Sequence, residues 1–180
     1  MRRVLIAPWG KPWKTIRDSS YSWEEVEYIF NDDRCRSRST LPLLTKALNP
    51  DCTVVIVLDT ALGLVPNNYD ELTKEIGDAY KDFINNQLGL RDDVKIIVAP
   101  GVGRFKTDDG YVEFKGSLID FYYIILHELS RILVELDDKA KVYLDISHGI
   151  NFMPTLTYRA VNEVLGVLAH TKKISLEVYN

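Results

Sequence analysis

The sequence predicts an α/β protein with a Rossmann-like, doubly wound, mainly parallel sheet and two inserted β-hairpins. Two observations lead to this class. Short runs rich in Val and Ile are apolar without alternation, which is typical of strands that helices cover on both faces. Amphipathic helical segments separate these runs, and such alternation implies right-handed crossovers between parallel strands. The predicted buried strands are residues 4–8, 53–58, 94–100 and 142–146.

A fifth strand and four helices complete the predicted layers. Residues 174–179 alternate apolar and polar side chains, which favours the edge of the sheet. The predicted helices are residues 41–48, 69–88, 117–136 and 154–171. Ser39 or Thr40 can cap the first helix, and Gly89 can end the second. Ser117 and Asp120 approximate a capping box for the third.

The two hairpins are predicted from bulky residues that alternate around turn sequences. In the first, residues 23–30 and 34–38 flank a turn at residues 31–33. In the second, residues 104–106 and 111–114 flank residues 107–110, which end in the strong hairpin signal Asp-Gly. Because no repeat or linker divides the sequence, we expect residues 1–180 to form one domain.

Composition excludes several classes of protein. The 180 residues are 46% hydrophobic and 27% charged, enough to bury a core and unlike a disordered chain. Cys35 and Cys52 lack CxxC spacing, so we expect no disulfide framework and a reducing, cytoplasmic setting. No apolar run is long enough for a membrane helix. The net charge of -4 argues against binding duplex nucleic acid.

Four loops are the places to look for a site, because open α/β sheets bind ligands beyond the carboxyl ends of their strands. They are residues 9–13, 59–61, 101–104 and 147–151. None carries a P-loop, a complete GxGxxG, a GxSxG elbow or an HExxH pair. The sequence therefore disfavours a classical nucleotide enzyme, an α/β-hydrolase and a zinc hydrolase, and we expect neither metal nor cofactor.

The loop at residues 147–151 carries the most chemistry. It leads into a helix, and a helix N-terminus with free N–H groups suits phosphate. Gly149 would let a ligand approach the backbone, and Ser147 lies beside it. His148 can donate to a phosphate or ribose, act as general acid or base, or simply bond to Asp145. Asn151 can contact a base edge or cap the helix.

The loop at residues 9–13 places two indoles around a lysine. Trp9 and Trp13 can stack on unpaired bases while Lys11 supplies positive charge to a phosphate. Packing in the core or at an interface between protomers is the alternative for both indoles. The loop thus suggests a nucleotide ligand without specifying one.

Four segments of the sequence together resemble a known family. They are residues 4–10 (VLIAPWG), 58–60 (LDT), 144–154 (LDISHGINFMP) and 176–180 (LEVYN). They look like the CARF (CRISPR-associated Rossmann-fold) domain, especially that of the archaeal CARF–HEPN ancillary ribonucleases of type III CRISPR systems. The stretch DISHGIN is the most specific part, although family members often have Thr where Ser147 stands.

The resemblance implies a homodimeric sensor of cyclic oligoadenylate, in the first place cyclic tetra-adenylate, that controls a HEPN ribonuclease in antiviral defence. No histidine follows an arginine at the HEPN spacing, so we expect no HEPN domain in these residues; the resemblance implies a C-terminal HEPN domain in a longer parent protein. The resemblance also implies ligand contacts at Thr60, Gly101 and Gly103, with weaker support than for the contacts named next. The contacts carried over by position are Trp9, Gly10, Lys11, Trp13, Ser147, His148, Gly149 and Asn151.

The alternative reading is an enzyme, a metal-independent ring nuclease. A ribose 2′-hydroxyl held in line would attack the neighbouring phosphate and leave a linear product with a 2′,3′-cyclic phosphate. His148, Lys11 and Trp13 would be its actors. A third reading, an unrelated Rossmann-like protein for another nucleotide, is disfavoured because GxGxxG is incomplete.

Overall fold

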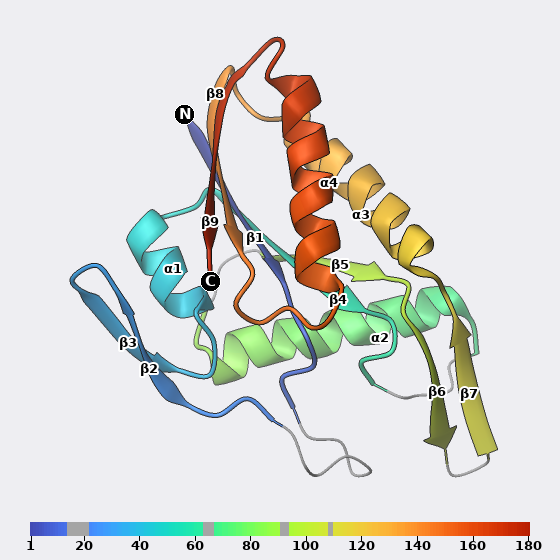
Figure 1. Ribbon diagram of the computed structural model, residues 1–180. Helices are drawn as coiled ribbons and strands as arrows, with labels where there is room; N and C mark the ends of the chain where they lie inside the picture. The colour runs from blue at the N-terminus through green and yellow to red at the C-terminus, as the bar shows by residue number, and fades with distance from the viewer. Residues whose placement is uncertain (14–21, 63–66, 91–93, 108–109) are drawn as a thin grey trace.

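A five-stranded parallel sheet forms the centre of the protein, in the order β5-β4-β1-β8-β9 (Figure 1). The computed structural model describes residues 1–13, 22–62, 67–90, 94–107 and 110–180. The predicted Rossmann-like sheet is confirmed. Its strands are β1 (Arg2–Pro8), β4 (Cys52–Leu58), β5 (Val94–Ala99), β8 (Lys139–Asp145) and β9 (Lys173–Tyr179).

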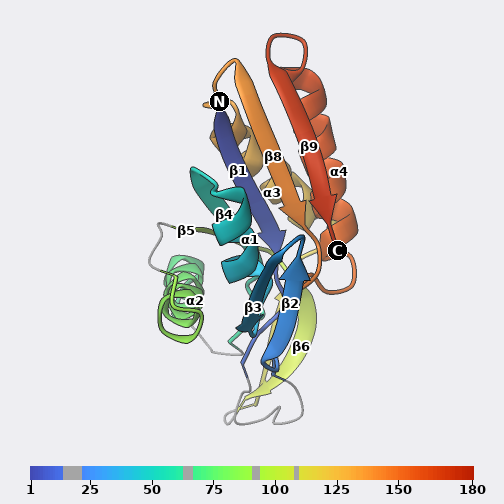
Figure 2. The same cartoon turned by 90° about the vertical axis from the view of Figure 1, so that its left-hand side faces the viewer.

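Helices cover both faces of this sheet, with α1 in front of it and α3 and α4 behind it in Figure 2. Successive side chains of a strand point to opposite faces, so β1 contributes Val4 and Ile6 to one core and Leu5 and Ala7 to the other. This two-sided burial explains the unbroken apolar runs. The helices are α1 (Leu41–Leu48) and α2 (Tyr69–Asp82), which continues into the π-helical turn η1 (Phe83–Gln87), and then α3 (Leu118–Leu133) and α4 (Met153–Leu168).

The two edges of the sheet differ from its middle. β9 forms one edge, as its alternation predicts. β5 forms the other edge. Its apolar residues still belong to both cores, Ile97 and Ala99 to one and Val94, Ile96 and Val98 to the other, so the predicted burial on both faces is confirmed, and Lys95 is its exposed residue.

Both predicted hairpins are present as separate two-stranded sheets. β2 (Val26–Phe30) pairs with β3 (Asp33–Ser37), and Asn31 takes the left-handed conformation in their turn, with φ of 52°. The strand begins at Val26 rather than Trp23, because Trp23 turns inward. β6 (Val102–Thr107) pairs with β7 (Gly110–Lys115), and residues 108–109 of the predicted turn lie outside the described residues.

The helix ends follow the sequence signals with one exception. Ser117 and Asp120 form the predicted capping box of α3, and Gly89 takes a φ of 70° after the helical segment. At α1, Thr40 occupies the N-cap position without a side-chain cap, while the Ser39 hydroxyl accepts from the amide of Leu41 at 3.1 Å. Within the described part of the chain, no helix has both the length and the apolar character to cross a membrane.

Candidate ligand-binding site

The candidate site lies where the direction of the sheet's winding reverses. β1 and β8 are neighbours; the chain builds outward from β1 through β4 to β5, and from β8 to β9. Such a switch point leaves a crevice at the carboxyl ends of the strands, where ligands bind in open α/β sheets. Two loops meet there, the β1 loop (residues 9–13) and the β8 loop (residues 146–152).

The two loops are joined through Gly10. Its amide donates to the His148 carbonyl at 2.8 Å, and its own carbonyl accepts from the Tyr80 hydroxyl of α2 at 3.2 Å. A Cβ on Gly10 would come within 2.7 Å of a methyl carbon of Ile150. The fold thus brings Gly10, His148 and Gly149 together, three residues that the sequence singled out.

Asp145, the last residue of β8, anchors the β8 loop. Its side chain is 1% exposed, one carboxylate oxygen accepts from the Thr40 hydroxyl at 2.5 Å, and the other accepts from the amide and hydroxyl of Ser147 at 3.0 and 2.6 Å. The predicted contact residue Ser147 is thus bonded to its own strand end. Asp145 therefore anchors the β8 loop through Ser147.

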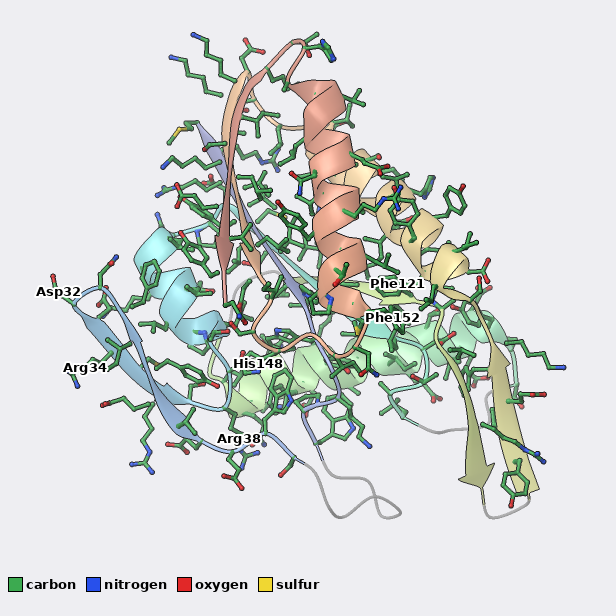
Figure 3. The ribbon with its side chains drawn as sticks, viewed as in Figure 1. Asp32, Arg34, Arg38, Phe121, His148 and Phe152 are labelled. Carbon is green, nitrogen blue, oxygen red and sulfur yellow. The ribbon has the colours of Figure 1, made fainter. Side chains whose placement is uncertain are left out.

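The side chain of His148, in the β8 loop, faces the first hairpin (Figure 3). Its Nε2 accepts from the backbone amide of Thr40 at 3.2 Å and lies 3.4 Å from the Tyr28 hydroxyl. Its ring stacks on Trp23 with 4.3 Å between centroids. Burial lowers the pKa of His148, and the nearby Asp145 carboxylate opposes this in part. The imidazole is therefore neutral at pH 7.

Gly149 and Asn151 shape the entry to α4. A Cβ on Gly149 would lie 2.6 Å from a ring carbon of Pro154, so this glycine fits the loop against its own helix. Asn151 is exposed and has a φ of 49°, and among the described residues no side chain caps α4, whose N-cap position is Phe152. The capping alternative for Asn151 is therefore wrong. The first turn of α4 also has no acidic residue, so its positive end is not neutralised locally.

The two indoles of the β1 loop are buried to different degrees. Trp9 is 0% exposed, meets Trp23 and Phe83 edge to face, and its Nε1 has no hydrogen-bond partner among the described residues. A ring without exposed surface cannot stack on a ligand in this structure, so Trp9 takes its alternative role in the core. Trp13 is half-buried against Tyr80, and Lys11 beside it is half-buried too.

Trp23 is a member of the site that the sequence analysis missed. It is 7% exposed and supports the His148 ring. Its place near an acidic stretch suggested the start of a solvated strand, and no periodicity relates it to a loop 125 positions away in the chain. The one available signal was a bulky indole among charged neighbours.

Thr60 and Gly101 belong to a second cluster, at the ends of β4 and β5. The buried Asp59 accepts from the Gly101 amide at 2.7 Å and from the Tyr69 hydroxyl at 3.4 Å, and a Cβ on Gly101 would meet Thr60 at 2.8 Å. Burial raises the pKa of Asp59 and raises that of Tyr69 to about 12.

This cluster borders a pocket of about 660 Å³ beside the second hairpin. Gly103 lies within β6, in that hairpin. Thr60 and Gly101 thus lie at the ends of the two strands that follow β1 in the sheet, and their part in ligand binding stays a prediction, as does that of Gly103. Among the residues that the structure describes, no group of His, Cys, Asp and Glu side chains is arranged to hold a metal ion.

The hairpin cations are solvated rather than gathered at the site. Arg34 and Arg36 pair with Glu27 and Glu25 at 3.4 and 3.2 Å, and Arg38 donates to Gln87 at 3.4 Å. Figure 3 shows Arg34 on the outer side of the hairpin. Positive character at the β8 loop comes instead from the positive end of the α4 dipole, which suits an anionic group such as a phosphate, although Met153 donates its amide to the Ile150 carbonyl and Pro154 has no N–H.

Comparison with known proteins identifies the family of this chain. The family model of the CARF domain of the CRISPR system endoribonuclease Csx1 matches residues 4–180. A curated relative, the CRISPR system endoribonuclease Csx1 of Methanocaldococcus jannaschii, is 40% identical over 182 residues that cover all of this chain. The chain spans 37% of the length of that relative. By the extent of the family match, this chain belongs to the Csx1 CARF-domain family.

Proposed function

We propose that residues 1–180 form a single ligand-sensing unit that binds a cyclic oligoadenylate, in the first place cyclic tetra-adenylate. The observation that carries this proposal is the meeting of the β1 and β8 loops, joined by the Gly10 amide, at the uncapped start of α4. Membership of the Csx1 CARF family supports the class of ligand.

The site offers groups for each part of such a ligand. Phosphates suit the positive end of α4, with Lys11 in the opposite loop. Asn151 is exposed beside this helix start, and its amide has both the donors and the acceptor that a base edge requires. Trp13, half-buried on Tyr80, is the indole of the β1 loop with surface left for stacking.

A second copy of the chain would complete the site. A cyclic oligonucleotide with an even number of identical units can lie on a two-fold axis, so each protomer would present the same two loops. Ile150 supports this arrangement, because it is 40% exposed at the rim of the β8 loop where a partner would cover it. We therefore propose a homodimer that binds one ring.

RNA cleavage would reside elsewhere. The curated relative is named an endoribonuclease, and this chain spans 37% of it. No histidine here follows an arginine at the HEPN spacing. We infer that these residues contribute ligand sensing to a longer ribonuclease, and that ligand binding shifts the population of two conformations of the dimer.

Calorimetric titration with cyclic tetra-adenylate, with linear tetra-adenylate as control, tests the proposal. We expect selective binding at one ring per two chains. Chromatography of the mixture after incubation tests the ring nuclease alternative, which linear product with a 2′,3′-cyclic phosphate would establish. Absence of binding by a folded chain would refute the proposal.

A matched pair of variants tests the site. Asn151→Gly removes the amide and preserves the left-handed backbone, and Asn31→Gly makes the same change at a φ of 52° in the β2–β3 turn. We expect a drop in affinity of about tenfold or more for Asn151→Gly, the loss of roughly one hydrogen bond to a charged or polar ligand group, and no change for Asn31→Gly. Equal affinities would remove Asn151 from the site.

A further inference from the structure

We propose that Thr40, Trp23 and Tyr28 are positioning residues that fix His148 as the neutral tautomer protonated at Nδ1, so that the Nδ1–H group is what His148 offers to a ligand oxygen. The part of this inference that concerns the ligand rests on the proposed function. The part that concerns the tautomer depends on the protein alone. None of the three residues was among the contacts that the sequence suggested.

The backbone amide of Thr40 sets the tautomer. It lies 3.2 Å from His148 Nε2, and an amide N–H can only donate. Nε2 must therefore keep its lone pair, and the proton of the neutral ring is on Nδ1. The Tyr28 hydroxyl lies 3.4 Å from the same nitrogen and can donate to it as well, so both neighbours favour an unprotonated Nε2.

Trp23 fixes the orientation of the ring. The two rings lie 4.3 Å apart at an angle of 29°, a stacked arrangement. Trp23 is itself held by edge contacts with Trp9 and Phe83, at 5.1 and 6.1 Å. A flip of the imidazole that exchanged its two nitrogens would have to proceed against this packing and break the Thr40 hydrogen bond.

The Thr40 position is fixed in turn by the strand that carries the loop. Its hydroxyl donates to Asp145 at 2.5 Å, and Asp145 also holds Ser147, the residue before His148. The donor of the key hydrogen bond and the backbone of its acceptor are thus attached to one buried carboxylate. The geometry of the pair is set before any ligand arrives.

The charges around His148 favour the neutral ring. Among the described residues, the titratable groups that face it are Asp145 from β8 and Tyr28 from β2, while Trp23 and Thr40 bring no charge. Desolvation is the largest influence on the pKa of His148 and lowers it. Protonation of Nε2 would also place two donors against each other at Thr40. A neutral donor at Nδ1 is therefore available throughout the neutral pH range.

This assignment gives His148 a definite role. No described residue accepts from Nδ1, so this N–H is available for a phosphate or ribose oxygen. Nε2, engaged by Thr40, is not available to take or give a proton in a reaction. His148 acts as a fixed donor in recognition rather than as a general acid or base.

Nitrogen-15 spectra of the ligand-free chain test the tautomer directly. We expect His148, identified by its loss in His148→Gln, to show a protonated Nδ1 and an unprotonated Nε2, with no titration near the ordinary histidine pKa of about 6.5. A protonated Nε2 in the neutral ring, or titration at the ordinary pKa, would overturn the proposal.

Two variants of Thr40 separate its amide from its hydroxyl. Thr40→Ala loses the hydrogen bond to Asp145 and keeps the N–H, whereas Thr40→Pro loses both and is compatible with the φ of -62° at this position. We expect the Nδ1–H tautomer to persist in the alanine variant and to be lost in the proline variant, with a rise in the pKa of His148. Persistence in a folded proline variant would show that the amide does not set the tautomer.

Addition of cyclic tetra-adenylate tests the contact. We expect the Nδ1 resonance of His148 to shift on binding, and the affinity to stay constant as the pH rises from the ordinary histidine pKa of about 6.5 to about 8. Binding without a shift at Nδ1 would refute the donor role. Failure to bind would refute the proposed function instead, while the ligand-free spectra still decide the tautomer.

Discussion

Replacing Gly149 by alanine perturbs the β8 loop at its tightest point. The added Cβ would lie 2.6 and 2.9 Å from two ring carbons of Pro154 and 3.3 Å from the Pro8 carbonyl. Pro154 is in the first turn of α4 and Pro8 ends β1, so neither can move alone. Gly149 does not have a positive φ, so the conflict is steric. Overpacking of this kind costs about 1–3 kcal/mol of the free energy of unfolding.

Gly166→Ala is the matched control. Gly166 lies within α4, the helix that follows the β8 loop, and nothing stands within 4 Å of a Cβ at that position. Alanine there should raise the free energy of unfolding by roughly 0.5–1 kcal/mol, because glycine loses more backbone entropy in a helix. The two substitutions are chemically identical and should therefore act in opposite directions.

Urea denaturation followed by far-UV circular dichroism measures both effects. We expect the midpoint to fall for Gly149→Ala and to rise for Gly166→Ala, with an unchanged dependence on urea concentration. The affinity for cyclic tetra-adenylate should also fall in Gly149→Ala, because the β8 loop must shift to admit the methyl group. A Gly149→Ala variant as stable as the parent, beside the expected gain for Gly166→Ala, would refute the steric reasoning.

Three further predictions follow from the buried groups. Asp145→Ala should lower the free energy of unfolding by roughly 3 kcal/mol or more in urea denaturation, since each hydrogen bond to a charged group contributes about 1.5–3 kcal/mol; a loss under about 1 kcal/mol would contradict its anchoring role. Trp9→Ala should cost about 3–5 kcal/mol in the same assay and Trp13→Ala clearly less; equal losses would contradict the placement of Trp9 in the core. Burial raises the pKa of Asp59 above 3.8, its value when unfolded, so the folded chain holds a proton that the unfolded chain has released. The free energy of unfolding of the parent relative to that of Asp59→Asn, measured across pH, should fall as the pH rises from 3.8 through the raised pKa of Asp59 in the folded chain. A rise over this interval would refute the raised pKa of Asp59.

The fold could be predicted from the sequence because each layer leaves a local signature. A parallel strand between two helical layers must be apolar at every position, and Val54 to Val57 show this without ambiguity. The edge position of β5 could not be recognised, because its residues are apolar on both faces, like those of a central strand. Which strand lies at an edge depends on pairing between distant segments, and local composition carries no record of it.

The site was predictable as a place and only partly as a set of contacts. The switch-point rule selects the β1 and β8 loops from strand order alone. It does not tell which side of a loop a residue faces. Trp9 follows β1 directly and continues its inward alternation, so it is buried, whereas Trp13 has left the strand and keeps some exposure. Trp23 reaches His148 through a fold-back of the chain that no sequence spacing encodes.

The residues at the switch point divide into a supporting layer and a surface. Asp145, Trp23 and Gly149 hold the loops through buried contacts, so their substitution should lower stability first and affinity only through it. Asn151 is exposed and makes no capping contact, so its substitution should lower affinity while stability stays nearly constant. His148 belongs to both groups, because its Nε2 is bound within the protein and its Nδ1 faces no described acceptor. Measuring unfolding and binding on the same variant therefore decides, residue by residue, whether a conspicuous side chain at this edge recognises a ligand or positions one that does.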